Sequence, residues 1–175
     1  MWQSTWETKL KKGNIGERLM ADYLRDNGFI VYAPDTRSQD VAHPFDRLVA
    51  SEDKKKLFVA EAKTKALRKH YPDTGIDIRH YNEYKHISDT YNIDILLFFV
   101  DEENGVTYGN FLSELEHRVE INVRGFVMKY PWKEIASERK IIYFPRVNMV
   151  EYGKIPPEYI AEINAHTTKN SIYKN

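Results

Sequence analysis

The run of residues 56–63 ends in an acid, Glu61, and a base, Lys63, within a stretch that is otherwise apolar. Side chains of a strand alternate between its two faces, so Glu61 and Lys63 share a face with Leu57 and Val59. A charged pair among apolar neighbours needs a partner or a chemical role. A divalent metal ion is the partner that best explains the pattern, because the carboxylate would bind it and the lysine would lie beside its bound water and a phosphate.

A second carboxylate precedes this run. Residues 45–50 are predicted to form a strand, and the polar residues that follow it are predicted to form a turn. If Ala50 pairs with Leu57 across that turn, Asp46 lies opposite Glu61. Directly opposed residues have Cβ atoms about 4.5–5.5 Å apart. Two carboxylates so close repel each other unless a cation lies between them, which predicts a site for Mg²⁺ or Mn²⁺.

A helix is predicted before these strands, at residues 13–28, with Asn14 as its cap and Gly28 at its end. Gly16 falls near the middle of the apolar face, where a glycine allows the helix to approach the sheet closely. Glu17 falls at the edge of that face and is expected to reach the carboxylate cluster. The alternative interpretation is that Glu17 is only a first-turn acid favoured by the helix dipole.

This order of a helix with Glu17, a hairpin strand with Asp46 and a strand with Glu61-x-Lys63 resembles the active-site pattern of the PD-(D/E)XK nuclease superfamily, which has the restriction-endonuclease-like fold. The resemblance covers about residues 13–100. Its N-terminal half is most similar to the Holliday-junction-resolvase-like branch. The residues that carry this second likeness are Lys12, Gly13, Glu17, Arg18 and Gly28–Val31.

The chain departs from the family pattern at the first acid. The family's proline stands directly before its aspartate, whereas here Phe45 separates Pro44 from Asp46. The upstream pair of Pro34 and Asp35 offers a second candidate. We prefer Asp46, because it alone gives the hairpin register that places an aspartate opposite the glutamate of the next strand.

The resemblance implies metal-dependent hydrolysis of phosphodiester bonds in DNA, including structured or branched DNA, to give 5′-phosphate and 3′-hydroxyl ends. It implies that Asp46, Glu61 and the carbonyl of Ala62 hold Mg²⁺ or Mn²⁺. Lys63 would orient and help to deprotonate the attacking water, and Glu17 would complete the acidic cluster or anchor the lysine. A homodimer is a further expectation, because many relatives cut duplexes as dimers.

Basic residues outnumber acidic ones between residues 54 and 86, around the predicted site. Such residues are expected to bind the phosphates of nucleic acid. The predicted contacts are Lys65, Arg68, Lys69, Arg79 and Lys85.

Composition limits the remaining choices. The 175 residues suit one nuclease-like domain, residues 1–175, with a loose polar tail at 166–175. No apolar run is long enough for a membrane span and no signal peptide is recognisable, so we expect no membrane association. The chain has no cysteine, which excludes disulfides and fits the reducing cytoplasm. The six histidines show no regular ligand spacing, so zinc is not expected.

We therefore expect an α/β fold with a restriction-endonuclease-like mixed central β-sheet flanked by helices. The predicted later elements are a loop at 64–77, a helix at 78–91 with its tyrosines in the core, a buried parallel strand at 95–100, strands at 106–112 and 125–130, a helical turn at 131–132, an edge strand at 140–144 and a helix at 157–165. Two other functions stay open. One is a catalytically inactive nucleic-acid-binding or protein-interaction module on the same fold, and the other is an interaction domain of an unrelated α/β fold.

Overall fold

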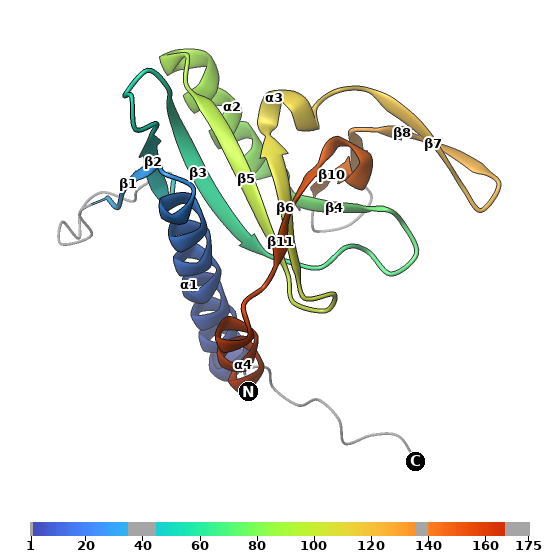
Figure 1. The fold of residues 1–175 in the computed structure, drawn as a ribbon. Coiled ribbons are helices and arrows are strands. Elements are labelled where there is room, and N and C mark those ends of the chain that lie inside the picture. Colours follow the sequence, from blue (N-terminus) through green and yellow to red (C-terminus); the bar gives the residue numbers. More distant parts are fainter. Residues whose placement is uncertain (1, 35–44, 136–139, 167–175) are drawn as a thin grey trace.

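The computed structural model describes residues 2–34, 45–135 and 140–166, and it confirms the predicted α/β architecture (Figure 1). Asp35 and Pro44, which entered the sequence argument, and the tail after His166 lie outside the described residues. The helices are α1 (Trp2–Asp26), α2 (Ile78–Tyr91), α3 (Leu112–Leu115), η1 (Arg146–Asn148) and α4 (Pro157–Ala165). The strands are β1 (Ile30–Tyr32), β2 (Arg47–Ala50), β3 (Leu57–Thr64), β4 (Asp73–Asp77), β5 (Asp94–Asp101), β6 (Val106–Phe111), β7 (Val119–Val123), β8 (Phe126–Tyr130), β9 (Trp132–Glu134), β10 (Ile141–Pro145) and β11 (Val150–Lys154).

The main sheet is mixed and has the strand order β1-β2-β3-β5-β6-β11. Strands β3 and β5 run parallel and are joined through α2, whereas the other neighbours are antiparallel. The register of β2 and β3 pairs Ala50 with Leu57 and Leu48 with Val59, as predicted. One residue beyond the last pair, Arg47 with Ala60, Asp46 lies against Glu61.

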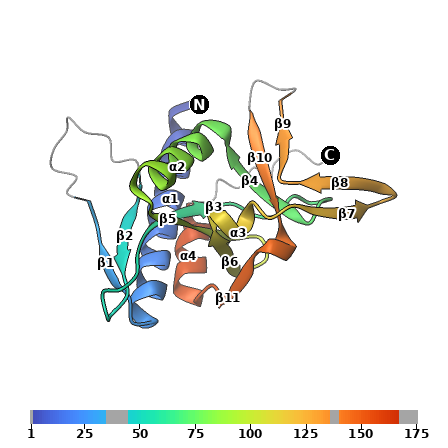
Figure 2. The ribbon, with the colours of Figure 1, turned by 90° about the horizontal axis from the view of Figure 1, so that it is seen from above.

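The alternation of side chains along the central strand β5 fills two cores. Leu96, Phe98 and Val100 pack with α1 and α4 on one face of the sheet. The residues between them, such as Leu97 and Phe99, pack with α2 and with β4 and β10 on the other face. Figures 1 and 2 show α1 and α4 side by side, and the β7–β8 hairpin projecting away from this body. The central strand is therefore buried on both faces, as its continuous apolar sequence predicted.

Helix α1 begins at Trp2, well before the predicted start, so Asn14 lies inside the helix and is not its cap. A single interior glycine costs about 1 kcal/mol relative to alanine and does not end a helix that is held by packing. Gly16 supplies that packing, because a Cβ at this position would overlap Oγ1 of Thr64 on β3. The predicted end is confirmed, since Gly28 has a φ of 82°.

The predicted loop at 64–77 is wrong in its second half, where β4 pairs with β10. Sequence pattern missed this strand because tertiary contacts stabilise it. Arg68 forms an ion pair with the buried Asp73, and the hydroxyl of Thr74 donates to the carbonyl of Ala66. Strand β10 lies between β4 and β9, so the predicted edge strand is a central one. Trp132 belongs to β9, which replaces the predicted helical turn.

The helices predicted at 78–91 and 157–165 match α2 and α4. Strands β7 and β11 were not predicted, although the alternating sequence of β7 is typical of a strand; Gly153 obscures β11, where the register shifts. None of the helices within the described segments is long and apolar enough to span a bilayer.

Candidate active site

Asp46 and Glu61 are held together by reciprocal hydrogen bonds at the end of β2. The backbone N–H of Asp46 donates to Oε2 of Glu61 at 3.0 Å. The backbone N–H of Ala62 donates to Oδ2 of Asp46 at 2.8 Å. Each acid therefore lies against the strand that carries the other. Strand β2 begins at the next residue, Arg47, so these side-chain bonds hold Asp46 against β3 just before the paired residues start.

Glu61 is the centre of the cluster, and it is 7% exposed. Its Oε1 accepts one hydrogen bond from Nζ of Lys63 at 2.7 Å and a second from the hydroxyl of Tyr84 at 2.6 Å. Lys63 also lies over the Tyr84 ring, with its Nζ 5.6 Å from the ring centroid. The Glu-x-Lys pair thus shares one face of β3, as predicted, and α2 closes over that face.

Tyr84 is a site residue that sequence reasoning assigned only to the core. Its ring is buried in the core between α2 and the sheet, while its hydroxyl contacts Glu61. A tyrosine at core spacing in a helix has the same sequence signature whether or not its hydroxyl reaches a functional group. Nothing in the local sequence distinguishes the two cases.

Glu17 reaches the cluster from the other side of the sheet. Its carboxylate lies 3.4 Å from the guanidinium of Arg47, and both side chains are partly buried. The alternative that Glu17 is a first-turn acid is wrong, because α1 begins at Trp2. Arg47 is a second residue that sequence reasoning missed.

Two carboxyl groups of the site, those of Asp46 and Glu17, have a raised pKa. Burial is the main cause that raises the pKa of Asp46 to about 7, and the negative charge of Glu61 is the second. Glu17 adds a smaller increase, whereas the hydrogen bond from the backbone of Ala62 lowers the pKa. Burial is also the main cause of the raised pKa of Glu17, which the positive charge of Arg47 opposes. Burial therefore makes ionisation of both acids costly, and the negative charge of Glu61 adds to that cost.

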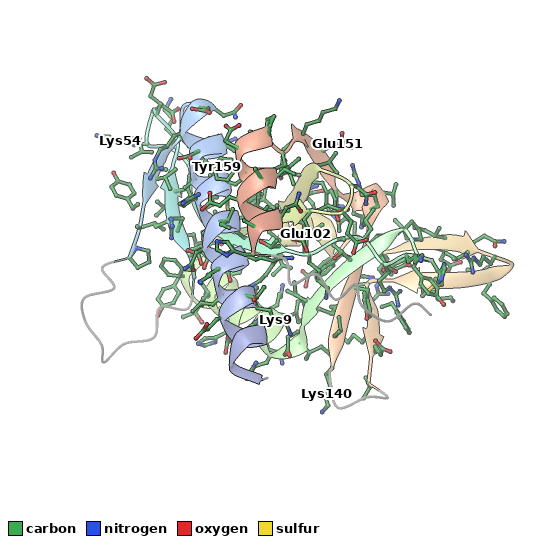
Figure 3. The ribbon with its side chains drawn as sticks, turned by 90° about the horizontal axis from the view of Figure 1, so that it is seen from below. Lys9, Lys54, Glu102, Lys140, Glu151 and Tyr159 are labelled. Atoms are coloured by element: carbon green, nitrogen blue, oxygen red, sulfur yellow. The ribbon has the colours of Figure 1, made fainter. Side chains whose placement is uncertain are left out.

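The cluster opens into a groove of about 770 Å³ between the N-terminal part of α1 and the end of β3. Beyond the acids, the wall includes Lys9, Lys12, Lys65, His80 and Glu102. Lys12 pairs with Glu102 at 2.8 Å. Figure 3 shows Lys9 on α1 and Glu102 after β5 on the same side of the molecule. The groove thus combines an acidic floor with a largely basic rim. The floor suits a bound cation, and the rim suits a polyanion that lies across it.

The predicted phosphate contacts are distributed unevenly. Lys65 lines the groove, with its Nζ donating to the carbonyl of Gly75 at 2.8 Å, and Lys69 is exposed on the following loop. Arg68 does not reach the groove. Its guanidinium is bound by both carboxylate oxygens of Asp73 at 2.5 and 2.6 Å. It is also enclosed by the rings of Tyr71, Trp132 and Tyr143.

The two predicted contacts on α2 also lie elsewhere. Arg79 lines a separate hollow together with Asn82. Lys85 pairs with Glu116 at 3.2 Å and with Asp89 at 3.8 Å. The helical turns that bring Tyr84 to Glu61 direct these side chains away from the groove.

Asp46 and Glu61 are the candidate ligands for a metal ion in this groove. Within the described ranges, no three His, Cys, Asp or Glu side chains form a cluster that would hold an ion as it stands. Mg²⁺ does not require one, because it commonly binds through one or two carboxylates and keeps several waters. Asp46 and Glu61 fit that mode, since they are adjacent, bear carboxylate oxygens and line the same groove.

No protein-family model matches the chain, and no curated protein matches it. Solved structures that resemble it include Hjc, a Holliday junction resolvase from the archaeal hyperthermophile Archaeoglobus fulgidus. The two chains are 10% identical, with a TM-score of 0.45, and the likeness covers 84% of this chain and 97% of the other. A likeness this distant carries no argument about function, so the geometry of the groove has to support any conclusion.

Proposed function

We propose that this protein is a metal-dependent nuclease of the PD-(D/E)XK type that hydrolyses phosphodiester bonds in DNA. The observation that carries the proposal is the single contact network of Asp46, Glu61 and Lys63, which places two adjacent acids and one ammonium group at the floor of a basic-rimmed groove. Branched or otherwise structured DNA is the proposed substrate class.

Asp46, Glu61 and the carbonyl of Ala62 would hold Mg²⁺ or Mn²⁺, with Glu17 as a further acid within electrostatic reach. When bound, the ion supplies Lewis-acid polarisation of the phosphoryl oxygen and favours hydroxide at neutral pH. The raised pKa of Asp46 supports this assignment, because a bound cation would offset the cost of burying its charge and the smaller repulsion from Glu61.

The chain's own groups have distinct roles in the proposed hydrolysis. Water attacks phosphorus and gives up a proton as the new oxygen–phosphorus bond forms; the bond to the 3′ oxygen breaks, and that oxygen takes up a proton from solvent to become the 3′-hydroxyl. The ammonium of Lys63 orients the water and stabilises the negative charge that develops on the phosphoryl oxygens. Glu61 holds Lys63 in place, and the hydroxyl of Tyr84 donates to the same oxygen of Glu61. Lys9, Lys12 and Lys65 along the groove would contact the flanking phosphates.

The test is cleavage of a four-way junction, a flap, a single strand and a linear duplex of the same labelled sequence, with and without Mg²⁺. We expect Mg²⁺-dependent products from the wild type and none from Glu61→Gln. Asp53→Asn is the matched control, because it neutralises an exposed acid on the β2–β3 turn, away from the groove. Cleavage that persists in Glu61→Gln, or a wild type that cuts none of the four DNAs, would refute the proposal.

An inactive nucleic-acid-binding module is the alternative on the same fold. It predicts DNA binding without any cleavage, and it does not require that Mn²⁺ binding be lost in Asp46→Ala. Calorimetric titration with Mn²⁺ separates the two functions. The nuclease proposal requires binding that the substitution removes together with cleavage. A cytoplasmic location and a homodimer accompany the proposal as expectations.

A further inference from the structure

The β7–β8 hairpin is an arm with one apolar face. Opposed pairs in an antiparallel ladder share a face. Three such pairs on one face are apolar, namely Val119 with Tyr130, Ile121 with Met128, and Val123 with Phe126. Phe126, at the tip, is 77% exposed. Figures 1 and 2 show the hairpin extending from the body of the molecule. Since a lone two-stranded hairpin is only marginally stable in water, an exposed aromatic at its tip indicates a binding partner.

The turn at the tip is made by an unusual residue. Arg124 and Gly125 have φ values of 53° and 88°, as a two-residue hairpin turn of the primed type requires. Asparagine or aspartate normally occupies the first position, because a longer side chain is disfavoured there. An arginine in this conformation places a cation at the end of the arm, which suggests a functional requirement.

Two more basic side chains belong to the same tip. A guanidinium NH₂ of Arg124 lies 3.1 Å from Nδ1 of His70, on the β3–β4 loop. A guanidinium can only donate, so Nδ1 of the His70 ring accepts this bond. Lys69 is exposed beside His70. Among the residues that the structure describes, no carboxylate pairs with Arg124 or Lys69.

We propose that this tip, defined by Lys69, His70, Arg124 and Phe126, binds a second segment of the DNA outside the groove. The inference rests on the proposed nuclease function and specifies its substrate further. Unpaired cations match phosphates, and an exposed aromatic ring stacks on bases that are not enclosed in a duplex. Phosphates and bases that are not enclosed in a duplex occur together where DNA branches. The loop that carries Lys69 and His70 continues directly from β3, so it links the groove to the arm.

A second copy of the chain fits the tip less well. A symmetric contact would bring two copies of the same surface together. The arginines and lysines of both tips would then meet with no acid to pair them, and like charges at an interface are unfavourable. The charge of the tip therefore favours a polyanion.

The experiment measures binding of full-length protein to fluorescent DNA in EDTA, so that no cleavage occurs. Arg124→Asn is the main variant, because asparagine suits the left-handed turn and removes only the cation. Phe126→Thr removes the ring and keeps a residue suited to a strand. Lys129→Gln is the matched control, because it removes one charge from the polar face of the same hairpin, where Lys129 pairs with Glu120 at 3.3 Å.

We expect Arg124→Asn to weaken binding to a four-way junction about fivefold to tenfold and to reduce the salt slope by about one. Phe126→Thr should weaken junction binding and leave a short linear duplex unaffected, and Lys129→Gln should match the wild type on both. If both tip variants bind every DNA like the wild type, or instead convert a dimer into a monomer in sedimentation, the arm inference is wrong while the nuclease proposal stands. A wild type that binds no DNA refutes both.

Discussion

Neutralising Asp46 should stabilise the metal-free protein while abolishing its activity. In the folded chain the pKa of Asp46 rises from an ordinary 3.8 to about 7, mainly through burial and the charge of Glu61. The folded state therefore binds more protons than the unfolded state between about pH 4 and 7. Stability from this group is present below pH 4 and is lost as the pH rises toward 7. Asp46→Asn removes the charge and retains an oxygen that can accept from Ala62.

The difference between the unfolded and folded pKa of Asp46 sets the size of the expected change in the free energy of unfolding. One pH unit corresponds to about 1.4 kcal/mol, so the largest penalty of the charged form at pH 8 is about 4 kcal/mol. Asp46 keeps partial access to water, and screening reduces this value. We expect Asp46→Asn to gain about 2 kcal/mol at pH 8, which corresponds to a rise of about 4–8 °C in Tm for a chain of this size.

Thermal unfolding in EDTA at pH 5 and pH 8 measures the effect. The wild type should lose stability between the two pH values by more than Asp46→Asn does, and Asp53→Asn should behave like the wild type. Mg²⁺ at pH 8 should raise the Tm of the wild type and leave that of Asp46→Asn unchanged, because ligand binding stabilises only a state that binds. An Asp46→Asn protein that melts lower than the wild type at pH 8 would show that the charged carboxylate is not under the predicted strain.

Three other substitutions test the site and the helix that supports it. Lys63→Ala should lower the cleavage rate by about two to four orders of magnitude. Its Mn²⁺ affinity should be unchanged or higher, because the lysine repels a cation. Equal cleavage rates for the wild type and Lys63→Ala at saturating Mg²⁺ would exclude Lys63 from the chemistry. Tyr84→Phe should reduce kcat by about tenfold with little change in KM, as loss of a charge-assisted bond to Glu61 implies, and an unchanged kcat would make Tyr84 purely structural. Gly16→Ala should destabilise by about 1–3 kcal/mol in urea unfolding through its clash with Thr64, and the further change Thr64→Ala should recover part of that loss.

The sequence predicted the part of the site that depends on strand alternation. A period of two and a short polar turn sufficed to place Asp46 opposite Glu61 and Lys63 beside it, because the register of a hairpin depends on a few local residues. The central strand and α2 could also be predicted from the sequence, since a continuous apolar run and a strong helical period are local signals.

What the sequence missed depends on contacts between distant segments. Strand β4 is rich in polar residues, and it exists because Arg68 and Tyr130 satisfy the buried Asp73. The same contacts remove Arg68 from the groove, although its position after the motif strand favoured a phosphate contact. Tyr84 and Arg47 are similar cases. Tyr84 contacts Glu61 only because α2 packs on one face of the sheet, and Arg47 contacts Glu17 only because α1 packs on the other.

The distribution of unsatisfied charge separates the groove from the rest of the protein. The buried Asp73 and Asp101 are both fully hydrogen-bonded, by Arg68 and Tyr130 in one case and chiefly by Asn104 and Tyr108 in the other. Across the described residues, the one buried side-chain oxygen without a partner is Oε2 of Glu102, and it belongs to a residue of the groove. The carboxyl group with a pKa near 7 is there as well. Elsewhere the chain satisfies its buried acids, whereas at this groove it keeps a carboxyl group that is costly to ionise and a carboxylate oxygen without a partner. Both features suit a binding site for a cation, which the proposed nuclease chemistry requires.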